Sequence, residues 1–395
     1  MAVRGTTRPT RLLFVQTQAE MAGAQEISRI LGEALARAGP AGEPAYDVHH
    51  LFLYRKSAGC DDFPNAHFAA RERPGNPLAK AAFFARLALM MRAIGADVVL
   101  PFQHYGNIVA GPLARLIGTR RIIANHVSAP ATISGTVRRL DRLLGMAGAY
   151  DVMTVNSQST WRDYMAYPER YRRRIVHVPH GFARKTATLD KAAARRALNL
   201  PETAALLGTV ARLHPLKRID LAMKLLPGNP DLHLAIAGQG PDADRLQAVA
   251  ATLAIRDRVH FLGERRPDEI GLLLASLDVF VFPSEAETFG LAAVEAADAG
   301  IPVVSHDMPV MREVLQVEGA PCALFVDAAD TEAFAARVRR LLTDRAEYDQ
   351  LSALGRQLGA AHSLEAMVAS YRALIEGTTP AGRPLPQPAR TGKAA

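Results

Sequence analysis

The chain has 395 residues with an ordinary globular composition, 49% hydrophobic and 22% charged, so at about 150 residues per domain we expect two or three domains. Its formal charge of +8 favours anionic partners, such as phosphorylated ligands or an acidic membrane surface, whereas scattered arginines without a basic-aromatic platform argue against nucleic acid. The absence of an apolar run of about 18 residues, of a signal-peptide core and of clustered cysteines predicts a reduced, cytoplasmic protein.

Short apolar runs rich in β-branched residues alternate with stretches of helical periodicity along most of the chain. The predicted strands are residues 11–15, 97–102, 121–124, 152–155, 174–178, 208–211, 233–237, 259–262, 279–283, 303–305 and 323–326. Regular strand–helix alternation is typical of parallel sheets with right-handed crossovers. Eleven strands are many for one sheet, so the pattern predicts an α/β fold with two Rossmann-like domains.

The chain divides at a charged segment without a predicted strand, which lies between the two series of strands. We expect an N-terminal domain over residues 1–183 and a C-terminal domain over residues 184–360. A last helical pattern covers residues 361–377, and the Pro-, Gly- and Arg-rich residues 378–395 are predicted to be disordered because they cannot bury a core.

Two glutamates, Glu287 and Glu295, lie eight positions apart in the segment PSEAETFGLAAVEAADAG. The segment follows a predicted strand, and the carboxyl ends of parallel strands are where such sheets bind ligands. If a helix begins near Phe289–Gly290, its free N–H groups favour an anion, and both carboxylates can reach one bound molecule. Acids in this position suit the hydroxyls of a sugar or a ribose, although solvated or arginine-paired glutamates would show the same spacing.

Two cations follow another predicted strand in the segment GTVARLHPLKRID. Arg212 and Lys217 flank a short loop there, and a pair of cations at a strand end suits a diphosphate that gains charge as it leaves. A third strand leads into AGQGP, where Gly238 and Gly240 let the backbone approach a ligand or a neighbour. As a dinucleotide-binding motif this turn is weak, because the third glycine and the ribose-binding acid are missing.

These motifs, in this order, resemble the retaining nucleotide-sugar glycosyltransferases of GT-B fold that carry the Glu-x7-Glu signature. The resemblance covers residues 205–375 and departs from the family pattern at Arg218, where the family has Gly, and at His180, where it has Asn. It implies two Rossmann-like domains that face each other across a cleft, with a C-terminal helix that crosses back to the N-terminal domain. The N-terminal domain would then bind the acceptor, and the C-terminal domain the nucleotide-sugar donor.

The resemblance also implies roles for individual residues. Arg212 and Lys217 would hold the donor diphosphate, Glu295 the ribose and Glu287 the hydroxyls of the transferred sugar. The other donor-binding positions are those where backbone approaches the ligand, namely Gly23, Gly238, Gly240, Phe289, Gly290 and Leu291.

Two histidines end predicted strands of the N-terminal domain. His126 matches a position where the family often has an active-site histidine near the anomeric carbon, and we expect a catalytic role for it beside Glu287, Arg212 and Lys217. His104 is predicted to contact the acceptor or to have an accessory role. The sequence alone does not distinguish these roles from that of an ordinary histidine at the end of a strand.

The resemblance implies transfer with retention of configuration, in which the leaving phosphate accepts the proton of the acceptor. We expect no metal and no cofactor, because the two cations and a helix N-terminus can stabilise the diphosphate and we find no Asp-x-Asp run suited to a divalent cation. A nucleotide-sugar epimerase, a non-catalytic sugar-nucleotide-binding protein and a dehydrogenase remain as alternatives, the last disfavoured by the missing glycine.

Family resemblance favours UDP as the donor nucleotide, followed by GDP, and leaves the acceptor open among glycans, lipid-linked molecules and small molecules. Residues 78–95 combine lysine and arginine with phenylalanine, leucine and methionine in a helical pattern. Such a helix packs against a sheet or lies on an anionic membrane, so peripheral contact with the inner face of a membrane is a further expectation.

Overall fold

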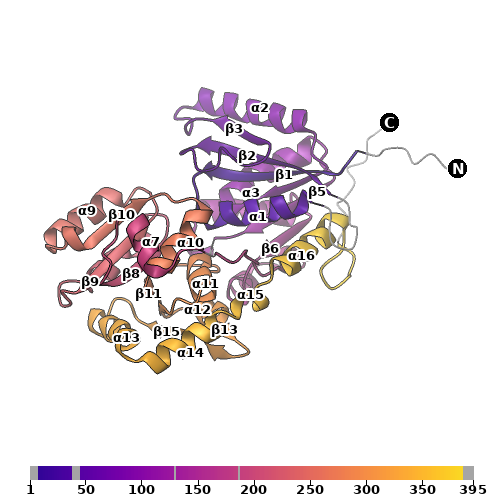
Figure 1. Cartoon of the computed structure of the whole chain (residues 1–395). Coiled ribbons are helices and arrows are strands. Elements are labelled where there is room, and N and C mark those ends of the chain that lie inside the picture. The colour runs from indigo at the N-terminus through magenta and orange to yellow at the C-terminus, as the bar shows by residue number, and fades with distance from the viewer. Residues whose placement is uncertain (1–7, 38–44, 129, 186, 386–395) are drawn as a thin grey trace, which may run out of the picture.

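The computed structural model describes residues 8–37, 45–128, 130–185 and 187–385, which form two α/β domains side by side (Figure 1). The elements of the first domain are β1 (Arg11–Ala19), α1 (Gly23–Leu35), β2 (Asp47–Arg55), β3 (Ala66–Ala70), α2 (Pro77–Ile94), β4 (Val98–Pro101), α3 (Gln103–Leu116), β5 (Arg121–His126), α4 (Gly135–Ala147), β6 (Val152–Val155), α5 (Gln158–Asp163), α6 (Glu169–Arg172) and β7 (Ile175–His177). Its seven strands form one parallel sheet in the order β3-β2-β1-β4-β5-β6-β7.

The second domain repeats the design with a six-stranded sheet in the order β10-β9-β8-β11-β12-β15. Its elements are α7 (Lys191–Ala197), β8 (Ala205–Val210), α8 (Ile219–Met223), β9 (Leu232–Ala237), α9 (Ala243–Thr252), β10 (Val259–Gly263), α10 (Pro267–Ser276), β11 (Val279–Phe282), α11 (Leu291–Asp298), β12 (Val303–His306), α12 (Pro309–Val314), β13 (Gln316–Val317), β14 (Ala320–Pro321), β15 (Ala323–Val326), α13 (Thr331–Thr343), α14 (Arg345–Gly355) and α15 (Leu358–Ala361). The pairs of this sheet are parallel, as strand–helix alternation predicts, and β13 and β14 form a small antiparallel ribbon.

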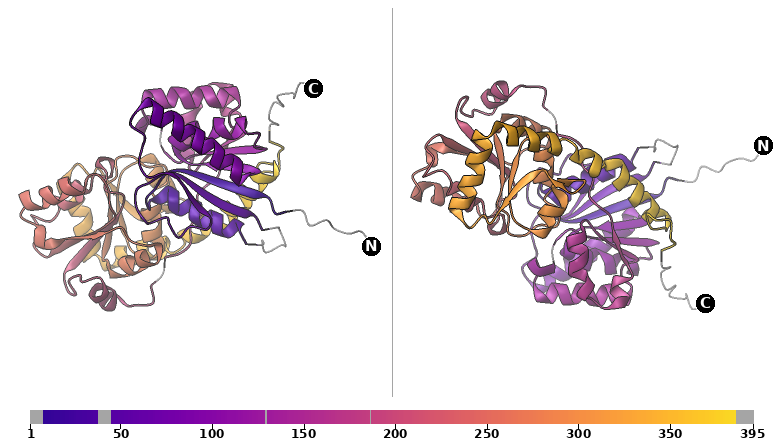
Figure 2. Two further views of the ribbon diagram at one scale, coloured as in Figure 1. Left: turned by 90° about the horizontal axis from the view of Figure 1, so that it is seen from above. Right: turned by 90° about the horizontal axis from the view of Figure 1, so that it is seen from below.

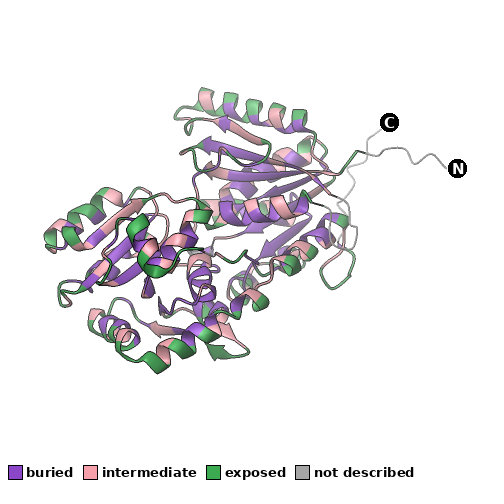
Figure 3. Cartoon of the chain, in the orientation of Figure 1, coloured by how far each residue is buried: buried purple, intermediate pink, exposed green. Residues whose placement is uncertain are grey.

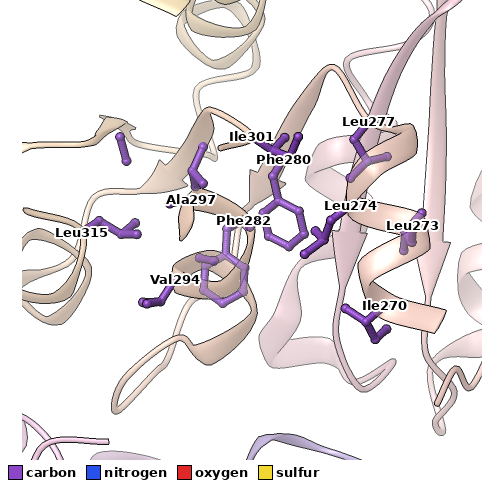
Figure 4. Packing of buried hydrophobic residues seen from close by; sticks show 14 of the residues in the cluster. Ile270, Leu273, Leu274, Leu277, Phe280, Phe282, Val294, Ala297, Ile301 and Leu315 are labelled. Carbon is purple, nitrogen blue, oxygen red and sulfur yellow. The ribbon is translucent and has the colours of Figure 1, made fainter. Parts of the chain in front are cut away.

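Each sheet is covered by helices on both faces, so its strands are buried while the outer faces of the helices are exposed (Figure 3). In the second domain, one core layer packs α10 and α11 against β11, with Phe280 and Phe282 between them (Figure 4). Gly208 in β8 is required by this packing, because a Cβ there would lie 2.2 Å from a methyl carbon of Leu277.

The last helix, α16 (Leu364–Glu376), returns to the first domain and packs on α1 and β5, as the family resemblance implied (Figure 2). Tyr371 donates a hydrogen bond of 2.6 Å from its hydroxyl to Asn125 Oδ1, and Arg121 donates to the carbonyl of Leu374. The chain therefore crosses between domains twice. The two crossings touch where Phe182 forms a parallel bridge with Ser363.

Residues 378–385 correct one expectation, since they were predicted to belong to a disordered tail. The Leu385 N–H donates to the carbonyl of Gly377, Thr378 pairs with Pro384, and the Leu385 side chain is buried in the first domain's core. The burial of this one large apolar side chain anchors the segment to the first domain. The rest of the predicted tail, residues 386–395, lies outside the described residues.

Among the described residues, no helix is both long enough and apolar enough to cross a bilayer.

Candidate functional site

A cavity of about 320 Å³ lies between the two domains, where the carboxyl ends of both parallel sheets meet. The first domain contributes the β1–α1 loop, the start of α3, and the ends of β5 and β6. The second domain contributes the loops that follow β8, β9, β10 and β11, together with the first turns of α11. Of the predicted site residues, the cavity is lined by Gly23, Arg212, Lys217, Gly238, Glu287, Phe289, Gly290, Leu291 and Glu295.

The β11–α11 loop places Glu287 directly before a helix that begins at Leu291. Gly290 caps this helix with φ of +74°, and a Cβ there would lie 2.6 Å from the sulfur of Met311, so only glycine fits both the backbone and the space. The first N–H groups of a helix lack intrahelical partners, and here they belong to residues that line the cavity. The loop thus offers an acid and an anion-binding helix end to the same space.

Each predicted diphosphate-binding cation lies beside an acid. The Lys217 ammonium donates a hydrogen bond of 2.5 Å to Glu287 within the second domain. Arg212 Nε lies 3.3 Å from a carboxylate oxygen of Glu20, which belongs to the first domain and is buried. An anion entering the cavity would compete with both carboxylates for these cations.

Glu295 faces the cavity from α11 and lies in a cluster of charges that the sequence did not predict. Lys185 Nζ lies 3.6 Å from Glu295 Oε1 and donates a hydrogen bond of 2.5 Å to Glu26 Oε1 of α1. Burial raises the pKa of Glu295 to about 7, although Lys185 lowers it. Burial also raises the pKa of Glu26, but hydrogen bonds from Arg29 and Lys185 outweigh that effect and leave it below its ordinary value.

The predicted glycines act by letting backbone segments approach one another. A Cβ on Gly238 would lie 1.9 Å from the carbonyl oxygen of Ala211, and a Cβ on Gly240 would lie 2.3 Å from that of Leu213. Gly240 does not line the cavity; it supports the loop that carries Arg212. Across the cleft, the Cβ position of Gly23 lies 4.0 Å from Leu291 Cβ, so a larger residue there would fill the gap between the domains.

His126 and His104, predicted as catalytic and accessory residues, lie away from the cavity. His126 is fully buried and its Nε2 lies 3.2 Å from the Tyr171 hydroxyl, while His104 Nε2 lies 2.7 Å from the Tyr164 hydroxyl. Burial lowers the pKa of both imidazoles to about 3. Their chain neighbours Val127 and Gln103 line the cavity instead.

His126 points away from the cavity because successive side chains of a strand point to opposite faces of the sheet. The predicted strand ended at residue 124, but β5 continues to His126, which shares a face with Ile122 beneath α3 and α4. Ile123 and Val127 lie on the other face. In this structure, neither histidine can therefore reach a ligand in the cavity.

The two histidines form a compact buried group with Asp141, with ligand atoms that all lie within 4.8 Å of one another. Tyr171 donates a hydrogen bond of 2.5 Å to Asp141, and Tyr150 donates another of 3.3 Å. The carboxylate of Asp141 and the Nε2 atoms of both histidines therefore each have a tyrosine hydroxyl as a hydrogen-bond partner. The absence of a metal site stays a prediction.

Several contacts across the cleft were not predicted, because single polar residues in loops carry no distinctive pattern. Glu264, after β10, accepts a hydrogen bond of 2.7 Å from the backbone N–H of Met21 in the first domain. Asn156, after β6, donates 3.1 Å to the Thr288 hydroxyl beside Glu287. The sequence offered one clue to their role, which is that each of these residues directly follows a strand. Together these contacts join the two domains beside the cavity.

Comparison with known proteins fits this architecture. Residues 190–358 match the family model described as "Glycosyl transferases group 1". The chain is 31% identical over 282 residues to a D-inositol 3-phosphate glycosyltransferase of Geodermatophilus obscurus, an alignment that covers 66% of this chain and 62% of the relative. A protein of the same name from Corynebacterium urealyticum is 30% identical over 57% of this chain and 57% of its own length. The chain thus spans less than two thirds of these curated relatives.

Two solved structures share the fold across nearly the whole chain. Anabaena Alr3699/HepE, crystallised with UDP and glucose, superposes with a TM-score of 0.77 at 17% identity, covering 93% of this chain and 99% of that one. WaaG, a glycosyltransferase involved in lipopolysaccharide biosynthesis, superposes with a TM-score of 0.70 at 16% identity, covering 93% and 100%. The chain has the GT-B fold, and its residues 190–358 are similar to the group 1 glycosyltransferases.

Proposed function

We propose that the protein is a retaining, metal-independent glycosyltransferase that moves a hexosyl group from a nucleoside-diphosphate sugar to a hydroxyl of an acceptor. UDP is the proposed donor nucleotide, with GDP as the second choice. The observation that carries the proposal is the convergence of two cations, two acids and a helix N-terminus on one cavity between the domains.

The charges of the cavity suit the breaking of a sugar–phosphate bond. Departure of the diphosphate leaves negative charge on its oxygens, and Arg212, Lys217 and the amides at the start of α11 lie together where they can stabilise it. Groups already fixed in position need no reorganisation as that charge develops. This charge stabilisation is the basis of the proposed metal independence.

The acids suit the hydroxyls of the donor. Glu287 lies beside Lys217 at the helix start, where it can accept hydrogen bonds from the transferred sugar, and Glu295 lies one turn further along, where it can accept from a ribose. We propose that the leaving phosphate, rather than a protein base, receives the proton of the acceptor on the face from which it departs. This route gives retention and needs no histidine, which agrees with His126 being buried away from the cavity.

The acceptor is proposed to bind on the first domain, which forms the opposite wall of the cavity. A glycan, a lipid-linked molecule and a small molecule are the three candidate classes. Exposed apolar side chains on α2, such as Leu78 and Leu89, would serve a peripheral contact with the inner face of a membrane. The curated relatives named above act on D-inositol 3-phosphate, and a phosphorylated small acceptor is accordingly included.

Thermal denaturation with a panel of nucleotide sugars tests the donor, since saturating ligand stabilises the folded chain by a few kcal/mol (about 2.7 at a hundred times Kd). Turnover of the stabilising donor with candidate acceptors then separates the alternatives. An epimerase would convert the donor without forming a transfer product, and a non-catalytic protein would bind it without turnover. The anomeric configuration of the product by NMR tests retention, and activity in excess EDTA tests metal independence. Failure of every nucleotide sugar to stabilise the chain would refute the proposal.

A further inference from the structure

His180 lies where the sheet of the first domain leads into the second domain. It comes three positions after the end of β7, the last strand of that sheet, and so belongs to the carboxyl edge at which parallel sheets bind ligands. It lines the cavity between the domains, together with Phe289 of the β11–α11 loop. The family resemblance has an asparagine at this position, and the proposed function gives the histidine no role.

The imidazole of His180 is buried without a hydrogen-bond partner in the part of the chain that the structure describes. Only 5% of the residue is exposed, and Nδ1 is enclosed with no donor or acceptor beside it among those residues. Proteins seldom bury a polar atom without a partner, so such an atom calls for an explanation. Because His180 lines the cavity, a ligand bound there can supply the missing partner.

The ring of His180 is uncharged. Burial, with smaller effects from His362 and His177, lowers the pKa of His180 to about 3. A neutral imidazole carries a proton on one nitrogen and a lone pair on the other. The side chain can therefore donate one hydrogen bond to an oxygen that bears negative charge, without bringing a charge of its own into the cavity.

The position of the ring is fixed by Phe289. The two rings meet edge to face, with centroids 5.3 Å apart and an interplanar angle of 68°. Phe289 follows Glu287, which the proposed function assigns to the transferred sugar, and precedes the start of α11, whose amides it assigns to the diphosphate. A hydrogen-bond donor beside Phe289 is therefore placed where the sugar joins the outer phosphate of the donor.

We propose that His180 is a further catalytic residue, whose N–H group donates a hydrogen bond to the outer phosphate of the donor and stabilises the charge that this phosphate gains. The inference rests on the proposed function, because it adds a residue to that reaction. His126, which the sequence predicted as catalytic, lies away from the cavity. A histidine from another element, the segment after β7, thus contacts the reacting group.

His180 does not act as a base in this step. The sugar–phosphate bond breaks with its electron pair on the phosphate oxygen, and the anomeric carbon forms a bond to the acceptor oxygen. The proton of the acceptor passes to the leaving phosphate. His180 keeps its own proton throughout and contributes only the hydrogen bond, which strengthens as the phosphate oxygen becomes more negative.

Three variants separate hydrogen bonding from packing. His180→Phe keeps a ring against Phe289 but removes both nitrogens, and His180→Asn restores an N–H donor. His362→Phe is the matched control, because His362 also packs edge-on against Phe289, with ring centroids 5.1 Å apart, but does not line the cavity. An effect transmitted through the Phe289 ring would appear in this control as well.

Isothermal titration with UDP and UMP, and steady-state kinetics at saturating donor, are carried out on the full-length variants; GDP and GMP replace these probes if the donor carries guanine. We expect His180→Phe to weaken UDP binding and to lower kcat, each by about tenfold to a hundredfold, the usual effect of one hydrogen bond to a charged group. UMP lacks the outer phosphate and should bind as it does to the wild type. His180→Asn should bind UDP more tightly than His180→Phe, and His362→Phe should keep the wild-type values.

Four results would overturn the inference: unchanged UDP affinity in His180→Phe, equal losses for UDP and UMP, equal UDP affinity of the Phe and Asn variants, or the same loss in His362→Phe. The last result would assign His180 to packing around Phe289. Melting temperatures show whether each variant is folded. If the wild type binds no nucleoside diphosphate and no nucleotide sugar, the proposed function fails, whereas wild-type binding that His180→Phe leaves unchanged refutes only the role of His180.

Discussion

The ammonium of Lys185 lies 3.6 Å from the carboxylate of Glu295, in the cavity where we propose that this acid binds a ribose. Lys185 belongs to the segment between the domains, and it also donates to Glu26 of the first domain. A ribose whose hydroxyls donate hydrogen bonds to Glu295 must share the carboxylate with this lysine. We therefore expect donor binding and the contact between the domains to be coupled through Lys185.

Glu295→Gln should stabilise the donor-free protein at alkaline pH. The pKa of Glu295 is raised to about 7 from 4.5, so the protonated carboxyl stabilises the fold; this contribution is complete below pH 4.5 and is lost as the pH rises through about 7. Glutamine keeps the neutral form at every pH. Urea denaturation should therefore show the variant more stable than wild type at pH 8 and equal to it at pH 4.5, with exposed Glu285→Gln as control. A variant less stable at pH 8 would contradict the assignment.

Lys217→Ala should lower kcat by about 10²–10³, the usual loss when one preorganised group that stabilises developing charge is removed. Its matched control is Lys224→Ala, which removes an exposed lysine at the end of α8. Steady-state kinetics with saturating donor separates turnover from affinity. A loss below about tenfold would assign Lys217 to pairing with Glu287 alone.

Gly240→Ala should both destabilise the protein and weaken donor binding. The residue has φ of +155°, and a Cβ would lie 2.3 Å from the carbonyl oxygen of Leu213, so the loop that carries Arg212 must move. The backbone conformation alone should cost about 1–3 kcal/mol. Gly228→Ala is the control, because no atom of the part of the chain that the structure describes lies within 4 Å of the Cβ position there. Equal melting temperatures of the two variants would show that the loop accommodates the methyl group without strain.

His50→Leu should make the protein more stable, and increasingly so in acid. Both ring nitrogens of His50 are buried between Phe14 and Phe63 without hydrogen-bond partners among the described residues, so leucine removes a cost of about 1–3 kcal/mol. Burial lowers the pKa of His50 to about 3 from 6.5, so its contribution to stability is present above pH 6.5 and is lost as the pH falls through about 3. Denaturation from pH 7 to 4 checks the trend against His306→Gln, a partly exposed site. A constant difference across that range would exclude titration of His50.

Apolar strands followed by helical patterns were sufficient to predict both sheets, but β2 and β3 were missed. β2 contains His49 and His50 within an otherwise apolar run, and β3 places a histidine among alanines, so neither shows a clear apolar pattern. β2 can be recognised as a strand only from its pairing with β1 and from the aromatic side chains that pack around His50. Local pattern is weakest where tertiary packing supplies the stability.

For the candidate site, residues that follow strands in recognisable motifs were brought together, whereas the acids facing them were not predicted. Glu20 lies 192 positions before Arg212, and Glu26 lies 159 positions before Lys185, so only the arrangement of the domains makes them neighbours. The position of His126 was predicted wrongly for a different reason. A strand end misplaced by two residues did not fix which of His126 and Val127 faces the cavity.

The bridge between Phe182 and Ser363 has a mechanical meaning. A Cβ on Gly181 would lie 2.3 Å from the carbonyl oxygen of Ser363, so the two crossings run against each other with no room for a side chain. Because the two connections between the domains touch at this point, we expect it to act as the hinge about which the domains rotate apart when substrate enters. A larger side chain at Gly181 would displace this hinge, and we expect it to change how far the domains open.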